Sequence, residues 1–471
     1  MFTGLVDRRR GGATAILEAG QSGWRRVSYD ELLRAAALRR EGLARTLRPG
    51  QLVFLRGNNS SAWLASFLAA TDAGAVVVPL PVSTPEPKVR ALAERLGVTA
   101  MLDAAHDFAP TRLPHAADAP PPPAGTAVVL LSSGTTGEPK GICLGAEGLA
   151  WGIRAEAPAN RFVGRPRLVT GPLSHMNGLT NSLRTLAGGG TVVYPADLSG
   201  RGVEDALVHG RVEEVLAVPA LFAKLLTEGR AGVTFPLVQH VSLGSAAPSE
   251  ELAGLIAAAF PEAVVTNRYG TTEAGFIVFQ FDSDAPLTSL GRPDPRVEVR
   301  LRDAADVEGG SEGVLQVRSP LRALGYLGTS APFPLEADGF VDTGDRFRVG
   351  PDGRWAWLGR ADDMVDCGGQ LISLEEVAQA VRSHPGVLNA QAVAVPSATK
   401  ANKPVVFVVP RGDAAPGEEE LRAWASQQLD PVALPRQVWL LDALPVGAAG
   451  KVDLAALRQR ALAEARPEVR L

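Results

Sequence analysis

The sequence predicts an α/β protein with a large N-terminal part and a small α+β C-terminal part. From Tyr29 to about Phe281, short apolar runs alternate with stretches of helical periodicity, which is typical of parallel sheets with crossover helices. Past Phe281 the runs become short and alternating, with Gly and Asp turn signals between them, which favours a β-rich subdomain. The segment that begins at Gly359 again combines helices and strands, and we expect it to form a small separate domain.

The expected elements follow from hydrophobic periodicity. In the N-terminal part the expected strands are 51–55, 74–80, 100–102, 128–131, 167–170, 191–194, 214–218, 238–243 and 263–267, and the expected helices are 29–47, 63–73, 89–96, 145–153, 179–186, 203–207, 219–226 and 250–260. Further on we expect strands 297–301, 313–317, 355–358, 387–395 and 404–410, and helices 374–382 and 418–428. The proline run at 119–124 is interpreted as a long surface loop, because the alternation resumes unchanged after it.

Length and charge narrow the class of protein. A chain of 471 residues is too long for one ordinary core, so two or more domains are expected. The net charge of -4, with mixed signs and no basic block, argues against nucleic acid and anionic membranes as partners. Small molecules or a protein carrier are the expected partners.

The start of the chain lacks the apolar core of a signal peptide, and the most apolar window, 63–82, is interrupted by Asp72, Gly74 and Pro79. We therefore expect a soluble, cytoplasmic protein. Cys143 and Cys367 lie far apart without a His/Cys cluster, which predicts two free thiols and neither a disulfide nor a zinc site.

The most informative stretch is 128–141, where an apolar run stops in Ser132-Ser-Gly-Thr-Thr-Gly137 and reaches Lys140. Small residues permit close backbone approach, hydroxyls donate hydrogen bonds and a lysine adds a cation, so the stretch is a phosphate-loop candidate. Pro139 before Lys140 and Gly141 after it exclude the Walker A pattern. A plain connecting turn remains the alternative interpretation.

Three further strand ends carry turns rich in small or polar residues. The first is 171–178, which contains His175, the second is Gly244 to Pro248, and the third is Arg268 to Gly275. Open parallel sheets bind ligands at the carboxyl ends of their strands, so a ligand role for His175 stands beside the structural role that a lone histidine usually has. If the 132–137 stretch were only a connecting turn, we would not expect three further turns of this kind at strand ends.

Two later loops carry charged residues. We expect Gly339 to Asp345 to be a turn whose paired carboxylates are either surface aspartates or acceptors for a diol. The segment Leu444 to Asp453 is expected to be a loop that presents Lys451.

Taken in order, six motifs resemble the adenylate-forming superfamily of acyl-CoA and aryl-CoA synthetases, peptide-synthetase adenylation domains and luciferases. They are Ser-Ser-Gly-Thr-Thr-Gly-Glu-Pro-Lys-Gly, Pro-Leu-Ser-His, Tyr-Gly-Thr-Thr-Glu, Asp-Thr-Gly-Asp, Gly-Arg-Ala-Asp-Asp and Gly-Lys-Val-Asp. The resemblance implies an N-terminal domain at 1–359, with two doubly wound subdomains and a β-barrel-like one, and a small mobile domain at 360–471. It also implies two half-reactions. A carboxylate and ATP give acyl-AMP and pyrophosphate, and a nucleophile, usually a thiol, then displaces AMP.

The resemblance assigns roles to matching residues. The loop residues Ser132, Ser133, Gly134, Thr135, Thr136, Gly137 and Lys140 would cradle pyrophosphate, and the other nucleotide contacts would be Gly244, Ser245, Ala246, Ala247, Pro248, Asn267, Arg268, Tyr269, Gly270, Thr271, Asp345 and Arg360. Among these, Tyr269 would stack on adenine, Asp345 would accept both ribose hydroxyls, and Arg360 would lie near the ribose and phosphate. The acid pocket would be lined by His175, Met176, Asn177, Gly178, Gly244, Gly270 and Phe276.

The catalytic group implied by the resemblance is Lys451, Glu273, Thr272 and His175, with Thr272 on the α-phosphate and Glu273 holding Mg²⁺. Lys451 would offset the repulsion between the acid and the α-phosphate during in-line attack. Asp362 matches the hinge about which the small domain rotates. Asp366 and Leu454 depart from the pattern, standing where relatives often have lysine and arginine, which puts tail packing and the second half-reaction in question.

The residues also bear on the acid and its acceptor. Pro172 to Asn177 offers no carboxylate for an α-ammonium, which favours an apolar or aryl acid over an amino acid. The stretch 363–373 resembles benzoate- and acyl-CoA ligases, so the expected substrates and cofactors are ATP, Mg²⁺ and CoA. The phosphopantetheine of an acyl carrier protein, or an amine, remains the alternative acceptor. A catalytically inactive nucleotide-binding protein is the remote alternative, and the chain is expected to be a monomer or a homodimer.

Overall fold

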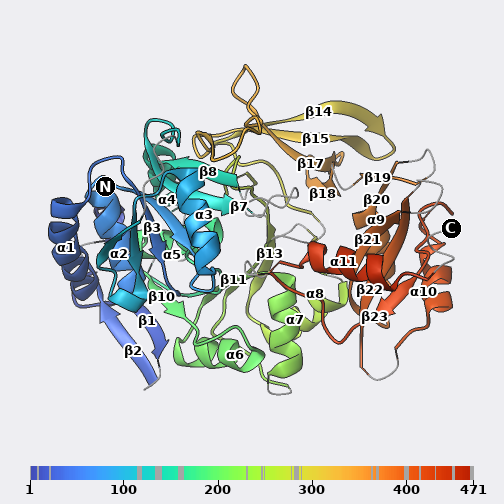
Figure 1. The fold of residues 1–471 in the computed structure, drawn as a ribbon. Coiled ribbons are helices and arrows are strands. Elements are labelled where there is room, and N and C mark those ends of the chain that lie inside the picture. Colours follow the sequence, from blue (N-terminus) through green and yellow to red (C-terminus); the bar gives the residue numbers. More distant parts are fainter. Residues whose placement is uncertain are drawn as a thin grey trace.

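The fold consists of two large sheets, a third antiparallel sheet and a C-terminal domain, with the termini at opposite ends of the molecule (Figure 1). The structure is a computed structural model. It describes residues 2–7, 10–20, 23–113, 119–132, 140–156, 164–229, 232–244, 248, 250–276, 278–279, 286–287, 289–361, 364–367, 371–396, 402–412, 415–429, 431–447 and 451–466.

The first seven-stranded sheet has the order β13-β12-β11-β9-β10-β1-β2 and is parallel except for the β1–β2 pair. Its strands are β1 (Thr14–Gly20), β2 (Gly23–Ser28), β9 (Pro166–Val169), β10 (Thr191–Tyr194), β11 (Glu214–Ala217), β12 (His240–Gly244) and β13 (Val264–Arg268). The helices α5 (Met176–Ala187), α6 (Gly200–His209), α7 (Pro219–Glu228) and α8 (Glu250–Ala259) connect its strands. The carboxyl ends of β9, β12 and β13 therefore lie along one edge, where the predicted turns begin.

The second seven-stranded sheet has the order β16-β8-β7-β4-β3-β5-β6, with a parallel centre and antiparallel edges. Its strands are β3 (Leu52–Arg56), β4 (Val76–Leu80), β5 (Ala100–Asp103), β6 (Pro110–Arg112), β7 (Thr126–Ser132), β8 (Lys140–Gly145) and β16 (Gly325–Leu327). The helices α1 (Tyr29–Thr46), α2 (Ser61–Asp72), α3 (Glu86–Leu96) and α4 (Ala146–Glu156) belong to this half of the chain. The phosphate-loop candidate connects β7 to β8.

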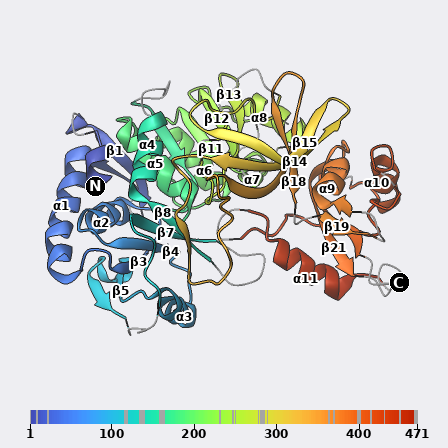
Figure 2. The ribbon, with the colours of Figure 1, turned by 90° about the horizontal axis from the view of Figure 1, so that it is seen from above.

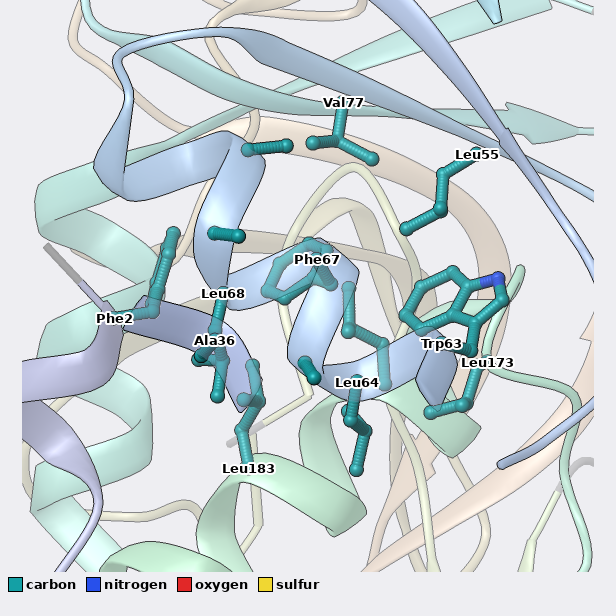
Figure 3. Packing of buried hydrophobic residues seen from close by; sticks show 14 of the residues in the cluster. Phe2, Ala36, Leu55, Trp63, Leu64, Phe67, Leu68, Val77, Leu173 and Leu183 are labelled. Atoms are coloured by element: carbon teal, nitrogen blue, oxygen red, sulfur yellow. The ribbon is translucent and has the colours of Figure 1, made fainter. Parts of the chain in front are cut away.

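A shared core joins the two halves. Figure 3 shows Trp63, Leu64 and Phe67 of α2 among buried side chains that include Leu173, from the β9-to-α5 connection of the other sheet, and Leu183, from α5. Trp63 and Phe67 are fully buried, and their rings stack with centroids 5.6 Å apart. Because Leu173 stands two residues before His175, this core fixes the backbone that leads to the site.

The β-rich subdomain is a four-stranded antiparallel sheet with the order β14-β15-β17-β18, and it lies between the large sheets and the C-terminal domain (Figure 2). Its strands are β14 (Glu298–Val307), β15 (Gly310–Arg318), β17 (Val341–Val349) and β18 (Trp355–Arg360). The C-terminal domain packs α9 (Leu374–Arg382), α10 (Glu418–Ala425) and α11 (Leu454–Glu464) with β19 (Met364–Asp366), β20 (Leu371–Ser373), β21 (Val387–Pro396), β22 (Asn402–Pro410) and β23 (Val438–Leu440).

The expected turn at Gly339 to Asp345 is wrong, because 341–349 forms strand β17. Its side chains alternate in burial, with Val341, Thr343, Asp345 and Phe347 on the buried face. The alternation of more and less buried side chains produces a strand in spite of Gly344, which favours turns. Gly344 adopts a φ of +69° within the strand. Asp342 and Asp345 consequently face different surroundings and do not form a pair.

Strands β1, β2, β6, β8, β16, β19, β20 and β23 and helix α11 were not predicted, although every expected N-terminal helix is present within a few residues. Cys143 and Cys367 are free and buried, as expected, and burial raises the pKa of the Cys143 thiol to about 11. Within the described ranges, no helix is long and apolar enough to cross a membrane.

Candidate active site

The loop that carries His175 is held by a side chain from the other sheet. Asn59, after β3, donates from Nδ2 to the carbonyl of Gly171 at 2.9 Å and accepts at Oδ1 from the backbone N–H of Leu173 at 2.8 Å. Helix α5 then begins at Met176, with His175 as its N-cap. Gly178 lies so close to the loop that an added Cβ would be 2.2 Å from the carbonyl oxygen of Pro172, so only glycine fits there.

His175 is half-buried, and its Nε2 has no hydrogen-bond partner among the described residues. Burial first, and then the positive charge of Lys451, lower the pKa of its imidazole. The structure therefore brings Lys451 of the C-terminal domain into electrostatic range of His175. The imidazole is expected to be neutral near pH 7, since its ordinary pKa of 6.5 is already below that pH.

Lys451 itself is exposed and stands in a closed hairpin. Val446 and Val452 form an isolated bridge, and the N–H of Gly447 donates to the carbonyl of Lys451 at 2.8 Å. Asp453 then caps α11 by accepting from the N–H of Ala456 at 3.0 Å. Hydrogen bonds of described residues before and after Lys451 therefore hold the segment that carries its ammonium.

Tyr269 and Asp345 form the centre of a second group. The Tyr269 hydroxyl donates to Oδ2 of Asp345 at 2.5 Å, and the indole N–H of Trp357 donates to Oδ1 at 3.2 Å. The Tyr269 ring also meets Phe347 edge to face, with centroids 4.9 Å apart. Burial and the Asp345 charge raise the pKa of the Tyr269 hydroxyl well above its ordinary value, so the phenol keeps its proton. Asp345 is 5% exposed, which makes it a fixed carboxylate.

Arg360 stands beside this carboxylate. Its Nη1 lies 3.7 Å from Oδ1 of Asp345 and donates to the carbonyl of Thr343 at 2.9 Å. An added Cβ at Gly344 would come within 2.9 Å of the same guanidinium. The residues matched to ribose and phosphate binding are therefore neighbours across the β17–β18 pair.

A third group surrounds Glu273. The chain closes on itself between Thr271 and Gly275, whose backbones exchange hydrogen bonds of 3.1 and 2.9 Å, so that Thr272 and Glu273 stand in the turn. Tyr326 of β16 donates its hydroxyl to Oε1 of Glu273 at 3.1 Å. The ammonium of Lys140 lies 5.2 Å from the centre of the Tyr326 ring. The lysine of the phosphate-loop candidate and the carboxylate are thereby connected through one aromatic side chain.

These oxygens suit a hard cation. Glu273 offers a carboxylate and Thr272 a hydroxyl, whereas the described residues contain no cluster of three or more His, Cys, Asp or Glu. A cation held by so few protein oxygens would take phosphate oxygens and water as its other ligands, and Mg²⁺ prefers such ligands.

The remaining predicted residues occupy the same edge or lie outside the described residues. Gly244 ends β12 and pairs with Arg268 at the end of β13, next to Asn267, whose side chain donates to the carbonyl of Leu287 at 3.1 Å. Met176, Asn177, Gly178, Gly270, Thr271 and Phe276 are described and lie on α5 or beside the Thr271–Gly275 turn, and Pro248 is buried. The structure does not describe Ser133, Gly134, Thr135, Thr136, Gly137, Ser245, Ala246, Ala247 and Asp362, and of Ser132 it describes only the strand.

Sequence reasoning missed Asn59, Tyr326 and Trp357. Asn59 holds the predicted 171–178 turn and Tyr326 contacts Glu273, both across more than 50 positions, whereas Trp357 contacts Asp345 across 12 positions. None of the three stands in a motif with a recognisable spacing. The strand-end position of Asn59, directly after an apolar run, was the one available signal.

Turns that converge at one sheet edge and a lysine from a second domain fit the arrangement expected for an enzyme that joins a nucleotide to another substrate. Comparison identifies the family. The AMP-binding enzyme family matches residues 6–327, and its C-terminal domain matches residues 376–451. The chain therefore belongs to the AMP-binding enzyme family of the adenylate-forming superfamily, and it is an ATP-dependent ligase that adenylates a carboxylic acid.

Three similar proteins span nearly the whole chain. Novobiocin biosynthesis protein H of Streptomyces niveus is 32% identical, over 96% of this chain and 80% of the length of that protein. A feruloyl-CoA synthase of Amycolatopsis is 29% identical over 95% of this chain and 96% of its own. The solved structure of the amide bond synthetase McbA from Marinactinospora thermotolerans aligns with a TM-score of 0.78 at 25% identity, covering 98% of this chain and all of that one.

Proposed function

We propose that the enzyme transfers the acyl group of its adenylate to the thiol of CoA. The adenylation step is supported by the adjacent strand ends at Gly244 and Arg268 and by Lys451, whose charge contributes, after burial, to the lowered pKa of His175. The resemblance of 363–373 to CoA ligases and the similarity to a feruloyl-CoA synthase favour CoA over other acceptors.

In the first half-reaction, a carboxylate oxygen of the acid attacks the α-phosphorus of ATP, and the bond to pyrophosphate breaks. Lys451 stands between the two anions and stabilises the charge that develops, an effect worth about 10² to 10³ in rate for a single well-placed donor. The neutral His175 borders the acid without adding a second positive charge to Lys451.

The other residues hold the nucleotide. Asp345 accepts the ribose hydroxyls, Tyr269 offers its ring face to adenine, and Arg360 neutralises phosphate charge. Thr272 contacts the α-phosphate. Mg²⁺, held by Glu273, would neutralise phosphate charge when bound.

In the second half-reaction, the CoA sulfur attacks the acyl carbonyl carbon, the bond to AMP breaks, and the thiol proton is released. We further propose that Asp362 is the hinge that moves the small domain, and thus Lys451, between the half-reactions.

The test is to incubate the full chain with ATP, Mg²⁺, CoA and a panel of carboxylic acids. AMP, pyrophosphate and an acyl-CoA thioester are expected in equal amounts, and ADP as the nucleotide product would refute the proposal. Omitting CoA should leave substrate-dependent exchange of pyrophosphate into ATP, which reports the first step alone.

Amide formation is the second candidate, because the alignment with the solved amide bond synthetase covers 98% of this chain at 25% identity. In this case the acyl group would leave on an amine. Offering CoA, a phosphopantetheinyl carrier protein and simple amines to the preformed adenylate separates the candidates by the product that accumulates.

A further inference from the structure

A row of polar side chains follows one face of helix α5. Asn177, Asn181 and Arg184 are spaced four and three residues apart, so they lie one above another on the same face of the helix. Asn181 and Arg184 are 5% and 7% exposed, whereas Asn177 is half-buried in the first turn, two residues after His175. The row therefore leads inward from the end of α5 that carries His175.

The inner end of this row contacts the predicted lining of the acid pocket. The Arg184 guanidinium stands 5.4 Å from the centre of the Phe276 ring. An added Cβ at Gly152 of α4 would lie 2.9 Å from the Cζ atom of the same ring, so Phe276 packs against α4 as well as α5. Phe276 follows directly after the turn that contains Glu273. The row and the Glu273 turn therefore border the same region of the site.

The chemistry of the three side chains fixes the direction of their hydrogen bonds. Nη1 of Arg184 donates to Oδ1 of Asn181 at 3.3 Å, and a guanidinium group can only donate. The amide nitrogen of Asn181 therefore faces the other way, and it donates to the carbonyl of Asn177 at 2.9 Å and to Oδ1 of Asn177. Because Oδ1 of Asn177 accepts from Asn181, the amide nitrogen Nδ2 of Asn177 is the outer end of the row.

This outer end has donors to spare. Nδ2 of Asn177 has no hydrogen-bond partner among the described residues. Two residues earlier, the buried Nε2 of His175 also has no partner among them. The plain alternative is a pair of helical side-chain amides whose outer N–H groups bind only water.

The positive charge at the inner end strengthens the donor at the outer end. Burial lowers the pKa of the Arg184 guanidinium to about 9, which leaves it charged at pH 7. Hydrogen bonds in a chain polarise one another, more strongly in a protein interior than in water. The guanidinium thus polarises the Asn181 amide, which in turn makes the N–H groups of Asn177 better donors. A ligand atom that accepts a hydrogen bond fits this position better than an apolar one.

We infer that the acid substrate carries an oxygen substituent, a hydroxyl, ether or carbonyl, that accepts a hydrogen bond from Nδ2 of Asn177 while the carboxylate faces Lys451. The inference rests on the proposed function and narrows its substrate to oxygenated acids. Phe276 would contact the hydrocarbon part of such an acid.

The experiment measures acid-dependent pyrophosphate release by the full chain with ATP and Mg²⁺, using pairs of acids of nearly equal shape. Each pair joins an ether to the hydrocarbon that has a CH₂ group in place of the oxygen. The pairs are ortho-, meta- and para-methoxybenzoate with the matching ethylbenzoates, para-methoxycinnamate with para-ethylcinnamate, and 3-methoxypropanoate with pentanoate. An ether oxygen accepts hydrogen bonds and cannot donate them. In the pair whose oxygen reaches Asn177, we expect the ether to have the higher kcat/KM by about 3- to 20-fold.

A kcat/KM for the hydrocarbon that equals or exceeds that of the ether in every pair overturns the inference and leaves adenylation standing. Pyrophosphate release that needs no acid, or that no acid of the panel elicits, contradicts both the inference and the proposed function. The two failures are therefore distinguishable.

The ratio of kcat/KM within the best pair is the readout for the variants. Asn177→Leu should bring the ratio close to unity, a loss of about 3- to 20-fold, whereas a merely structural role would lower both members alike. Asn181→Leu should cause a smaller loss, because Nδ2 of Asn177 remains but is no longer oriented and polarised from behind. An unchanged ratio in Asn177→Leu overturns the inference.

Asn177→Asp keeps the size of the side chain and offers only acceptors, and it supplies the test if Asn177→Leu does not fold. This variant should favour the ethyl acid over the methoxy acid, and the corresponding hydroxy acid, which can donate, over the methoxy acid. A methoxy acid that stays preferred in Asn177→Asp contradicts the inference. The control is Asn389→Leu, which removes a half-buried amide from β21 in the C-terminal domain and should leave the ratio unchanged.

Discussion

The group of residues proposed to hold the nucleotide and the group proposed to meet the acid are built differently. Asp345 is buried and already hydrogen-bonded by Tyr269 and Trp357. On the acid side, Lys451 is exposed on a hairpin of another domain, and His175 Nε2 has no partner among the described residues. If the proposed roles hold, the part of the site that meets the nucleotide is organised before binding, whereas the part that meets the acid depends on where the C-terminal domain places Lys451.

The largest loss of activity should come from a change on the acid side, to which the C-terminal domain supplies Lys451. Lys451→Ala removes the ammonium between two anions, and we expect pyrophosphate release to fall about 10² to 10³-fold. ATP binding should change little, because the nucleotide contacts proposed on β17 and β18 remain. Isothermal titration with ATP, beside exchange of pyrophosphate into ATP, measures the two quantities. Unchanged exchange in this variant would remove Lys451 from the mechanism.

On the preorganised side, Asp345→Asn should mainly weaken nucleotide binding. The side chain keeps its size but loses the negative charge that faces the ribose hydroxyls and Arg360. We expect kcat/KM for ATP to fall about 10- to 100-fold, with a smaller change in KM for the acid. If the acid KM changes as much as the ATP KM, the contrast between the two sides is wrong.

Tyr326→Phe tests the surroundings of Glu273, the carboxylate proposed to hold Mg²⁺. Losing the hydroxyl frees Glu273 to reorient, and we expect about a 3- to 10-fold increase in the Mg²⁺ concentration that gives half-maximal pyrophosphate release. Titrating Mg²⁺ at saturating ATP measures it. Tyr194→Phe is the matched control, since Tyr194 is buried and its hydroxyl bonds Ser182 and not Glu273. An equal shift in both variants would mean that Tyr326 acts only on stability.

The smallest effect tests the contact between the domains. In Lys451→Ala the pKa of His175 should rise toward its ordinary value of 6.5, while burial still keeps it below that value. In both proteins the folded state binds this proton less readily than the unfolded chain, so the contribution of His175 to stability falls as the pH drops below about 6.5. NMR titration of the His175 ring measures the pKa, and identical values would show that Lys451 does not approach His175 in solution.

The sequence predicted elements whose signal is local. Apolar runs such as 191–194 and 214–217 became strands at almost the expected bounds because burial on both faces of a parallel sheet leaves a continuous apolar run. Strand β1 was not predicted, since its pairing with β10 joins residues that are far apart in the chain. Strand β17 was mistaken for a turn because Gly344 and two aspartates interrupt a real alternation.

The same distinction applies to the site. Residues within motifs, such as Glu273 and Lys451, were found because a family resemblance carries them, and their roles remain predictions. Tyr326 and Asn59 were not found, because their importance lies in contacts with residues more than 50 positions away. Only the folded chain brings such pairs together.

The packing at Gly178 has a consequence for redesign. Because an added Cβ would collide with the carbonyl oxygens of Pro172 and Gly171, the start of α5 cannot be moved to enlarge the pocket without rebuilding the loop. A change of acid scope is therefore most accessible by exchanging side chains at Met176, Asn177 and Phe276 on a backbone left in place. Libraries for new substrates should keep glycine at 178 and vary those three positions together.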